Sequence, residues 1–189
     1  MRRAEKREHL IDVAAALFNR FGYHAAGVDK VIAESGIAKT TLYRHFPSKE
    51  DLIVAVLQRI DERFRRDMQD AVDQAADEPR GKLLATFDFL EEWFRGASFY
   101  GCPFISAAGE YGERQSAIFK EAAHHKRLLI GYFEDLAEQA GLAEPKTLAE
   151  EINLLHEGAI AVAHINGDAA AAARAKAVAA QLIEAASSG

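Results

Sequence analysis

Basic, hydroxyl and aromatic side chains follow one another in the stretch of this chain that runs from Lys39 to His45. Lysine and arginine can hydrogen-bond to guanine edges in the major groove of DNA, and threonine can contact a thymine methyl group. Tyrosine and histidine can contact phosphate oxygens. The stretch therefore offers the chemistry of a DNA-binding surface, on the side chains of Lys39, Thr40, Thr41, Tyr43, Arg44 and His45.

Two short helices joined by a tight turn are predicted to position these side chains. Apolar spacing indicates a first helix over 28–35, Gly36 can supply a left-handed turn, and a second helix covers 39–46. Three apolar residues can pin the two helices together, namely Val31, Ile37 and Leu42. Helix, glycine turn and helix in this order predict a helix-turn-helix motif.

The rest of the chain also has helical periodicity, and no segment has the convincing alternation of a strand. Ser48 is a candidate N-cap for a long helix, with Asp51 placing a carboxylate near the helix start. The sequence predicts an all-α fold in which a three-helix, DNA-binding head of residues 1–46 precedes a larger helical body of residues 47–189. The helices expected outside the motif cover 3–21, 48–76, 82–96, 103–111, 116–140, 145–166 and 169–186.

With these elements in place, roughly the first 55 residues resemble the TetR (tetracycline-repressor) family of bacterial transcription regulators. The resemblance rests on Phe18, Phe21-Gly22-Tyr23, Gly36-Ile37, Thr41-Leu42-Tyr43-Arg44-His45-Phe46 and Ser48-Lys49-Glu50-Asp51-Leu52. It implies a sequence-specific DNA-binding regulator, a repressor that a small-molecule ligand releases from its double-stranded operator. Beyond these residues the resemblance consists mainly of helix order and length.

Carried over by position, the resemblance implies that the second helix of the motif enters the major groove. It makes Lys39, Thr40, Thr41 and Arg44 candidates for base edges, and Tyr43, His45 and Lys49 candidates for phosphate contacts. Lys49 would act together with the N-terminus of the following helix, whose free N–H groups favour an anion.

The chain departs from the family pattern at the entry to the motif. Ala26 and Gly27 stand where the family usually has threonine or serine, so a capping, phosphate-binding hydroxyl is missing. Ile32 stands where a small residue is usual, which bears on the packing angle of the two helices.

The resemblance also implies a homodimer, formed through the helices near 146–165 and 169–186 as a four-helix bundle. Four alanines on these helices would let two subunits approach closely, namely Ala159, Ala163, Ala175 and Ala179. The alternative is that these alanines pack within one subunit, because alanine places few demands on its surroundings.

Family members release DNA when a small molecule enters the helical body, so an effector site is expected here as well. Eleven aromatic residues lie between Phe87 and Phe133 and suit an apolar or aromatic effector. The candidates for its lining are Phe87, Leu90, Trp93, Phe94, Phe104, Tyr111 and Phe119. For any single one of them, ordinary core packing is the preferred interpretation.

Charge and composition further limit the class of protein that this chain can be. The net charge of −6 hides a basic N-terminal part, since residues 1–50 carry nine Lys and Arg against six Asp and Glu. Cys102 is the only cysteine, which excludes an intrachain disulfide and fits a reducing cytoplasm; whether it senses redox state stays open. Neither a secretion signal nor a membrane-spanning segment is indicated.

No motif for catalysis, a cofactor or a metal site is recognisable, so we expect no catalytic residues, no cofactor and no bound metal. His124, His125, His156 and His164 lack the spacing of a metal cage and are expected at the surface or in a pocket. Two alternatives remain: a helical enzyme or small-molecule-binding protein whose head is structural only, and a helical scaffold for protein partners. Activation instead of repression also stays open, as do the operator, the regulated genes and the effector.

Overall fold

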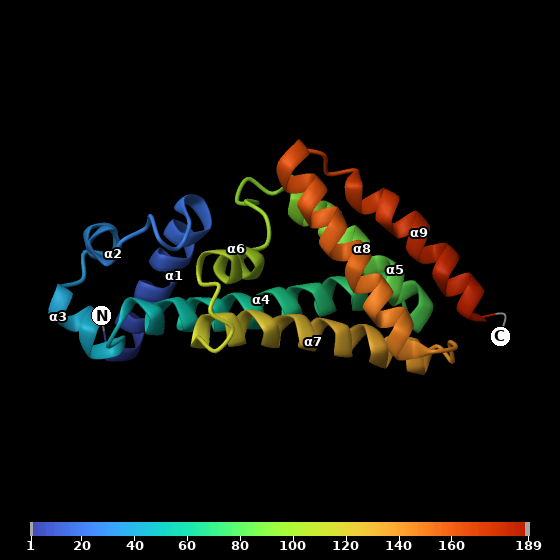
Figure 1. Ribbon diagram of the computed structural model, residues 1–189, viewed down its shortest axis with the longest axis horizontal. Helices are drawn as coiled ribbons and strands as arrows, with labels where there is room; N and C mark the ends of the chain where they lie inside the picture. The colour runs from blue at the N-terminus through green and yellow to red at the C-terminus, as the bar shows by residue number, and fades with distance from the viewer. Residues whose placement is uncertain (1, 188–189) are drawn as a thin grey trace. The chain divides into compact units, whose positions relative to one another are not determined.

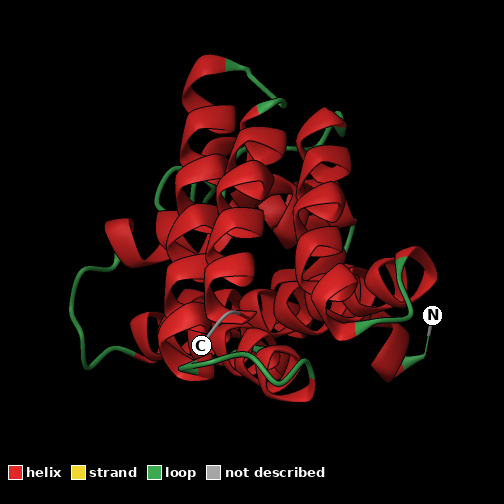
Figure 2. Cartoon of the chain, turned by 90° about the vertical axis from the view of Figure 1, so that its right-hand side faces the viewer, coloured by secondary structure: helices red, strands yellow, loops and turns green. Residues whose placement is uncertain are grey.

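The computed structural model describes residues 2–187, and their regular structure is helical (Figures 1 and 2). Within this range the chain forms nine helices and no strand, which confirms the predicted all-α fold. The helices are α1 (Arg3–Phe21), α2 (Val28–Ser35), α3 (Lys39–His45), α4 (Lys49–Ala75), α5 (Pro79–Arg95), α6 (Pro103–Glu110), α7 (Ala117–Gln139), α8 (Pro145–Asn166) and α9 (Ala171–Ser187). None of the helices in the described part of the chain combines the length and apolar character needed to cross a bilayer.

Two compact units divide the chain. The first consists of Met1–Arg63 and Pro103–His125, and the second of Phe64–Cys102 and Lys126–Gly189. Helices α1, α2, α3 and α6 belong to the first unit, and α5, α8 and α9 belong to the second, while α4 and α7 contribute residues to both. The predicted head of residues 1–46 therefore lies within the first unit.

Local signals end and start the helices of the head. Gly36 follows α2 in the left-handed region, with φ of 65°, and its N–H donates to the carbonyl of Ile32, as expected for a glycine turn. Gly27 caps the start of α2 without a side-chain hydrogen bond, so the hydroxyl cap is indeed missing. At the start of α4, the Asp51 N–H donates to Ser48 Oγ over 3.0 Å, and the Ser48 N–H donates to Asp51 Oδ2 over 3.0 Å. This reciprocal pair confirms Ser48 as the N-cap.

A small apolar core fixes the helix-turn-helix. Val31, Ile37 and Leu42, the three residues predicted to pin the motif, are all buried. Further buried side chains lie on α1, directly after α3 and at the start of α4, namely Leu10, Ile11, Ala14, Phe46, Leu52 and Ile53. Because α2 and α3 are short, this shared core decides the angle between them.

Two helix starts differ from the sequence prediction. Helix α5 begins at Pro79 and not at Lys82, because proline has no N–H to leave unpaired and its fixed φ suits the first helical position. Helix α9 begins at Ala171 and not at 169, because the Ala170 N–H donates to Asp168 Oδ1 over 3.0 Å in a turn that precedes the helix.

The second unit is built on α5, α8 and α9, which pack against one another. Lys176 on α9 forms an ion pair of 2.7 Å with Asp88 on α5. The four alanines proposed as spacers between subunits lie inside the subunit: Ala159, Ala163, Ala175 and Ala179 are all buried. Their assignment to the face between subunits was therefore wrong, because their side chains are buried where α8 and α9 pack within one chain.

His156 on α8 is buried in the core of the second unit. Its Nε2 lies 2.9 Å from Thr86 Oγ1, and the Thr86 hydroxyl donates to the Leu83 carbonyl over 2.7 Å. The hydroxyl oxygen is thus the acceptor, and His156 carries its proton on Nε2. The ring also packs against Phe87, with centroids 4.3 Å apart. Burial lowers the pKa of His156 to about 3, helped by the charge of Lys126.

This buried imidazole makes the stability of the protein sensitive to acid. Since the pKa of His156 is lowered to about 3 in the folded state, the unfolded chain binds the proton more readily between pH 3 and pH 6.5. Stability from this group is therefore complete above pH 6.5 and falls as the pH is lowered. We expect a loss of about 2 kcal/mol in the free energy of unfolding between pH 7 and pH 5, measured by urea denaturation.

In the His156→Gln variant the absolute stability changes, but this part of the pH dependence should disappear. His124→Gln is the matched control, because His124 is exposed on α7. A pH dependence that is identical in the wild type and the His156→Gln variant would contradict the assignment.

Candidate nucleic-acid interface

Helix α3 brings six of the seven predicted DNA-binding residues together on one short element. The side chain of Leu42 on this helix is fully buried, so the opposite face of the helix points outward. Tyr43 is 40% exposed, Lys39, Thr40 and Arg44 are exposed, and Thr41 and His45 are half-buried. The arrangement offers hydroxyl, amine, guanidinium and aromatic groups on a helix narrow enough for a major groove.

Lys39 is held by an acidic neighbour on α2. Its Nζ lies 3.0 Å from Asp29 Oδ1, and both side chains remain largely exposed to solvent. This hydrogen bond and the charge of Asp29 raise the pKa of Lys39 above its usual value. An exposed pair of this kind contributes little to stability, so a DNA group can replace Asp29 without a large cost.

Lys49, the seventh predicted residue, lies at the start of α4. Its Nζ donates to the backbone carbonyl of His24 over 3.2 Å. The lysine thereby ties α4 to the loop between α1 and α2, and its contact with a phosphate stays a prediction.

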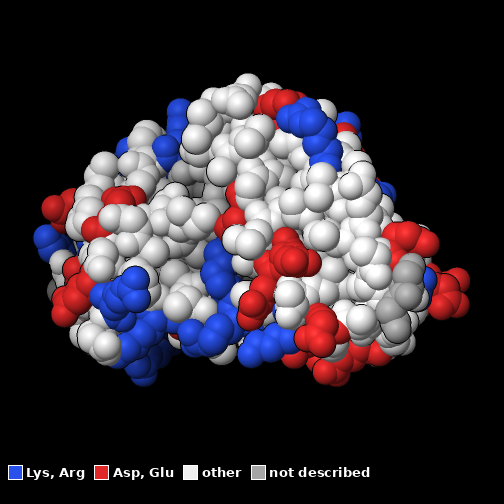
Figure 3. Space-filling model, turned by 45° about the vertical axis from the view of Figure 1, so that its right-hand side comes forward, with Lys and Arg blue, Asp and Glu red and all other residues white. Residues whose placement is uncertain are grey.

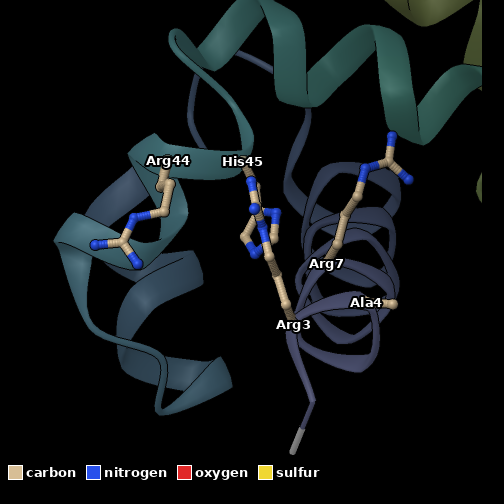
Figure 4. A pocket seen from close by; sticks show the side chains of 5 residues that line it. All are labelled: Arg3, Ala4, Arg7, Arg44 and His45. Atoms are coloured by element: carbon tan, nitrogen blue, oxygen red, sulfur yellow. The ribbon is translucent and has the colours of Figure 1, made fainter.

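A pocket at the junction of α1 and α3 adds basic groups that the sequence interpretation missed. Arg3, Ala4 and Arg7 from α1 and Arg44 and His45 from α3 line an open surface pocket of about 510 Å³ (Figure 4). Lys and Arg side chains also gather in a patch at the lower left of the space-filling view (Figure 3). The sequence signal that was overlooked is the spacing of Arg3 and Arg7, which places both side chains on one face of α1, one helical turn apart.

A carboxylate from α6 holds the turn between α1 and α2. The backbone N–H of Tyr23 donates to Glu110 Oε1 over 2.9 Å, and that of His24 donates to Glu110 Oε2 over 2.6 Å. The His24 ring stacks on Tyr111, with centroids 4.5 Å apart. Gly22 precedes this turn with φ of 84°, and a Cβ there would lie 3.1 Å from Glu110 Oε1. The close approach of the carboxylate therefore requires both the conformation and the small size of glycine.

The aromatic residues predicted to line an effector site fall into both units. In the second unit, Trp93 packs edge-on against Phe64 with centroids 5.2 Å apart, and it also contacts Phe94. Phe87 and Leu90 are fully buried in the same unit.

In the first unit, the predicted lining residues have other partners. Phe104 stacks on His125 with centroids 3.7 Å apart, and His125 Nδ1 lies 2.7 Å from Asp61 Oδ1. Tyr111 stacks on His24, and Phe119 is half-buried on α7. The lining role of all seven residues stays a prediction.

A polar cluster lies within the second unit. Lys126 Nζ on α7 lies 2.5 Å from Glu157 Oε1 on α8 and 3.4 Å from the sulfur of the buried Cys102. Two buried oxygens of α8, Asn153 Oδ1 and Glu157 Oε2, have no hydrogen-bond partner among residues 2–187. Over the same residues, no three His, Cys, Asp or Glu side chains gather closely enough to hold a metal ion.

The Glu110 contacts lead to a test of how firmly the turn is held. Glu110→Gln removes the charge that strengthens both hydrogen bonds. We expect the amide hydrogens of Tyr23 and His24 to exchange about tenfold faster in this variant, measured by hydrogen–deuterium exchange. Glu113→Gln is the control, since it removes the same charge from an exposed position three residues later. Equal exchange in both variants would show that the carboxylate does not hold the turn.

Comparison with known proteins connects this surface to a family. Residues 10–56 match the family described as bacterial regulatory proteins, TetR family. The transcriptional activator FasR of Mycolicibacterium smegmatis is 37% identical over 97 residues, which are 50% of this chain and 44% of that protein. The transcriptional regulator LmrA of Bacillus subtilis is 26% identical over 160 residues, which are 82% of this chain and 85% of that protein.

The likeness extends to three dimensions. A solved structure described as a TetR transcriptional regulator from Streptomyces avermitilis has a TM-score of 0.82 at 28% identity, over 96% of this chain and 98% of that one. The family match covers α2 and α3, the two helices of the helix-turn-helix. Residues 10–56 therefore carry the DNA-binding region of the TetR family, and the whole chain has the fold of a TetR transcriptional regulator.

Proposed function

We propose that the protein is a homodimeric repressor, which a small-molecule effector releases from its operator. The observation that carries the proposal is α3, which exposes base-reading and phosphate-binding groups while its own Leu42 is fixed in the core. Lys39, Thr40, Thr41 and Arg44 read base edges, and Tyr43, His45 and Lys49 contact the backbone. The head acts from the cytoplasm, where bacterial DNA is found.

An exposed apolar stripe on α8 supports the dimer. Leu154 is 70% exposed and Ile165 is 79% exposed, and both lie on a face that continues through exposed Gly158, Ala161 and Val162. Val178 on α9 is also exposed. These residues repeat at helical spacing, and an apolar face of this size favours association with a second copy. We propose that α8 and α9 of two subunits pack as a four-helix bundle.

Dimerisation sets the geometry of DNA binding. Two copies of α3 related by a two-fold axis read two half-sites, and these lie about 34 Å apart when both are on one face of the duplex. The affinity for the operator therefore depends on the spacing of the two heads, and a change in that spacing releases DNA.

The effector site is proposed in the second unit, where Phe87, Leu90, Trp93 and Phe94 supply apolar surface. The unpartnered Asn153 Oδ1 and Glu157 Oε2 are both acceptors, one helical turn apart on α8. Burying an acceptor without a donor is costly, so these oxygens favour a ligand that donates hydrogen bonds. We therefore propose a planar aromatic effector that carries a hydroxyl, amine or amide donor. Phe104, Tyr111 and Phe119, the candidates in the first unit, stay predictions.

Release follows from a shift between conformations. A ligand changes the equilibrium only if it binds one body conformation more tightly than the other. Two elements lead to the head: α4, which begins directly after the helix-turn-helix, and α6, whose Glu110 holds the turn after α1. We propose that the effector-bound form moves these elements and misaligns the two copies of α3.

Fluorescence anisotropy on DNA that flanks the protein's own gene tests operator binding. We expect tight binding to this duplex that survives physiological salt, and weaker, salt-sensitive binding to a scrambled duplex. Tyr43→Ala should weaken operator binding about tenfold, because a phosphate contact is lost. Ile165→Glu should weaken it further, because a charge in the proposed interface separates the subunits.

Matched substitutions control both variants. Tyr100 is 41% exposed, close to Tyr43, and Tyr100→Ala should leave DNA binding unchanged. Ile105 is exposed on α6, and Ile105→Glu should leave the dimer intact in sedimentation experiments, unlike Ile165→Glu. Equal binding to both duplexes would count against an operator-reading head, and a wild-type monomer in sedimentation would count against the proposed dimer. Higher transcription of the flanking gene in the presence of the protein would indicate an activator.

A paired ligand panel tests the effector proposal. The panel contains planar aromatic phenols and amines, each with its methyl ether or dimethylated analogue, which lacks the donor. We expect the compounds that raise Tm and release the labelled operator to come from the donor-bearing half of the panel. In Asn153→Leu, which removes one acceptor at similar volume, the advantage of the donor-bearing compounds should shrink.

Asn166→Leu serves as the control, because Asn166 is exposed at the end of α8. Donor-free compounds that release DNA as effectively as their partners would contradict the proposed chemistry of the site. A panel in which no compound binds would contradict an aromatic effector.

A further inference from the structure

The pocket at the junction of α1 and α3 is lined by basic side chains and by no carboxylate. Arg3, Ala4 and Arg7 come from α1, and Arg44 and His45 come from the end of α3. The pocket is a wide depression of about 510 Å³ that is open to solvent, so a hydrated anion can enter it. Figure 4 shows the His45 ring between Arg44 and Arg7, with the Arg3 side chain crossing the ring in this view.

The positive charge of this pocket is poorly neutralised. Among residues 2–187, neither Arg3 nor Arg44 forms an ion pair. Arg7 pairs with its neighbour Glu8 over 3.2 Å, and its guanidinium lies over the ring of Phe46.

The acidic side chains of α1 near the pocket are already engaged. Glu5 pairs with Arg2 over 2.6 Å, and Glu8 contacts both Arg7 and Arg59. The uncompensated positive charge of the pocket therefore favours binding of an anion from outside the chain.

His45 is the titratable group that faces this cluster. Arg3, Lys6 and Arg7 act on it from α1, and Arg44 acts on it from α3. Burial and then these four charges lower the pKa of His45 below its ordinary value. The ring is therefore neutral at pH 7 in the free protein, and a negative charge in the pocket would raise the pKa of His45 again.

We propose that this pocket is a phosphate-binding site for the DNA backbone, and that His45 takes up a proton when the phosphate enters. Arg3 and Arg7 thereby extend the DNA-binding surface from α3 to α1. A phosphodiester is the occupant that the geometry favours, because the pocket shares Arg44 and His45 with the helix that reads the bases. The inference rests on the DNA binding of this family and is independent of the proposed effector.

Salt dependence measures the phosphate contact directly. Each phosphate neutralised by a basic residue contributes about 0.9 to the slope of log K against log salt concentration. We expect Arg3→Gln to lower this slope by about 0.9 per subunit and to weaken binding about eightfold per subunit at 0.1 M salt. A labelled duplex of random sequence suffices as the probe, because a backbone contact does not depend on sequence.

Arg80→Gln provides the matched control. Arg80 is exposed in the first turn of α5, as Arg3 is in the first turn of α1, and the change in net charge is the same. Equal salt slopes for the two variants would overturn the proposal.

Proton uptake provides the second measurement. The wild type should bind the duplex more tightly as the pH falls from 8 to 6, with uptake approaching one proton per subunit. His45→Gln should remove this part of the pH dependence, since glutamine keeps a hydrogen-bond donor but does not titrate. An unchanged pH dependence in His45→Gln would overturn the role of His45, whichever residues read the bases.

Titration with inorganic pyrophosphate separates the pocket from DNA binding as a whole. In NMR spectra of the full chain, millimolar pyrophosphate should shift the ring signals of His45 toward the protonated form, while equal ionic strength of chloride should not. Pyrophosphate that moves His45 without displacing the duplex would indicate a separate anion site and overturn the assignment to the DNA backbone. If neither pyrophosphate nor the duplex moves the His45 signals, the pocket is not a phosphate site. A wild type that binds no duplex at all would instead contradict the DNA-binding role. The pyrophosphate titration would still test the pocket, because it needs no DNA.

Discussion

Helix α3 has only seven residues, so its shape and position depend on what it packs against. A helix of this length is not stable alone in water, because the cost of forming its first turn is never recovered. The burial of Leu42 fixes which side of α3 faces the core, and the Phe46 ring closes its C-terminal end. The Ser48 cap then starts α4 only a few residues later. Every exposed group of α3 is positioned by these contacts, and not by the helix itself.

The same dependence explains why a residue far along the chain matters to the head. Glu110 holds two backbone N–H groups of the turn that leads into α2, although 87 and 86 residues separate it from Tyr23 and His24. A carboxylate that accepts two N–H donors is a firm attachment, since charge strengthens both bonds. Movement of α6 therefore has to displace this turn or break both bonds. The proposed release of DNA by an effector needs this kind of connection.

Local features of the chain could be predicted because their causes are local. Gly22 and Gly36 end helices, and Ser48 with Asp51 starts one, within a few residues of the atoms that they satisfy. The outward face of α3 was predictable for the same reason, because burying Leu42 leaves only one orientation for a single short helix.

Contacts between distant residues could not be predicted in this way. Nothing in the spacing of Glu110 distinguishes it from the many other acidic residues of the body, and the pairing of Lys39 with Asp29 depends on the angle between α2 and α3. The alanines of α8 and α9 show the same limit, because a small side chain suits a contact within the subunit as well as one between subunits. Arg3 and Arg7 had a readable spacing, but their relation to His45 exists only once α1 has folded against α3.

Charge places a further constraint on how this regulator finds its site. The chain is acidic overall, with a net charge of −6, so its attraction to DNA at a distance is limited to the basic part of the head. Even there, Lys39 forms an ion pair with Asp29 in the free protein. Non-specific binding, which depends on phosphate contacts alone, must compete with the repulsion of the acidic body. Base contacts at a true operator add energy that non-specific DNA does not offer, and specificity is the difference between these two affinities. By weakening the phosphate contribution, the acidic body leaves a larger share of the total affinity to the base contacts proposed for α3.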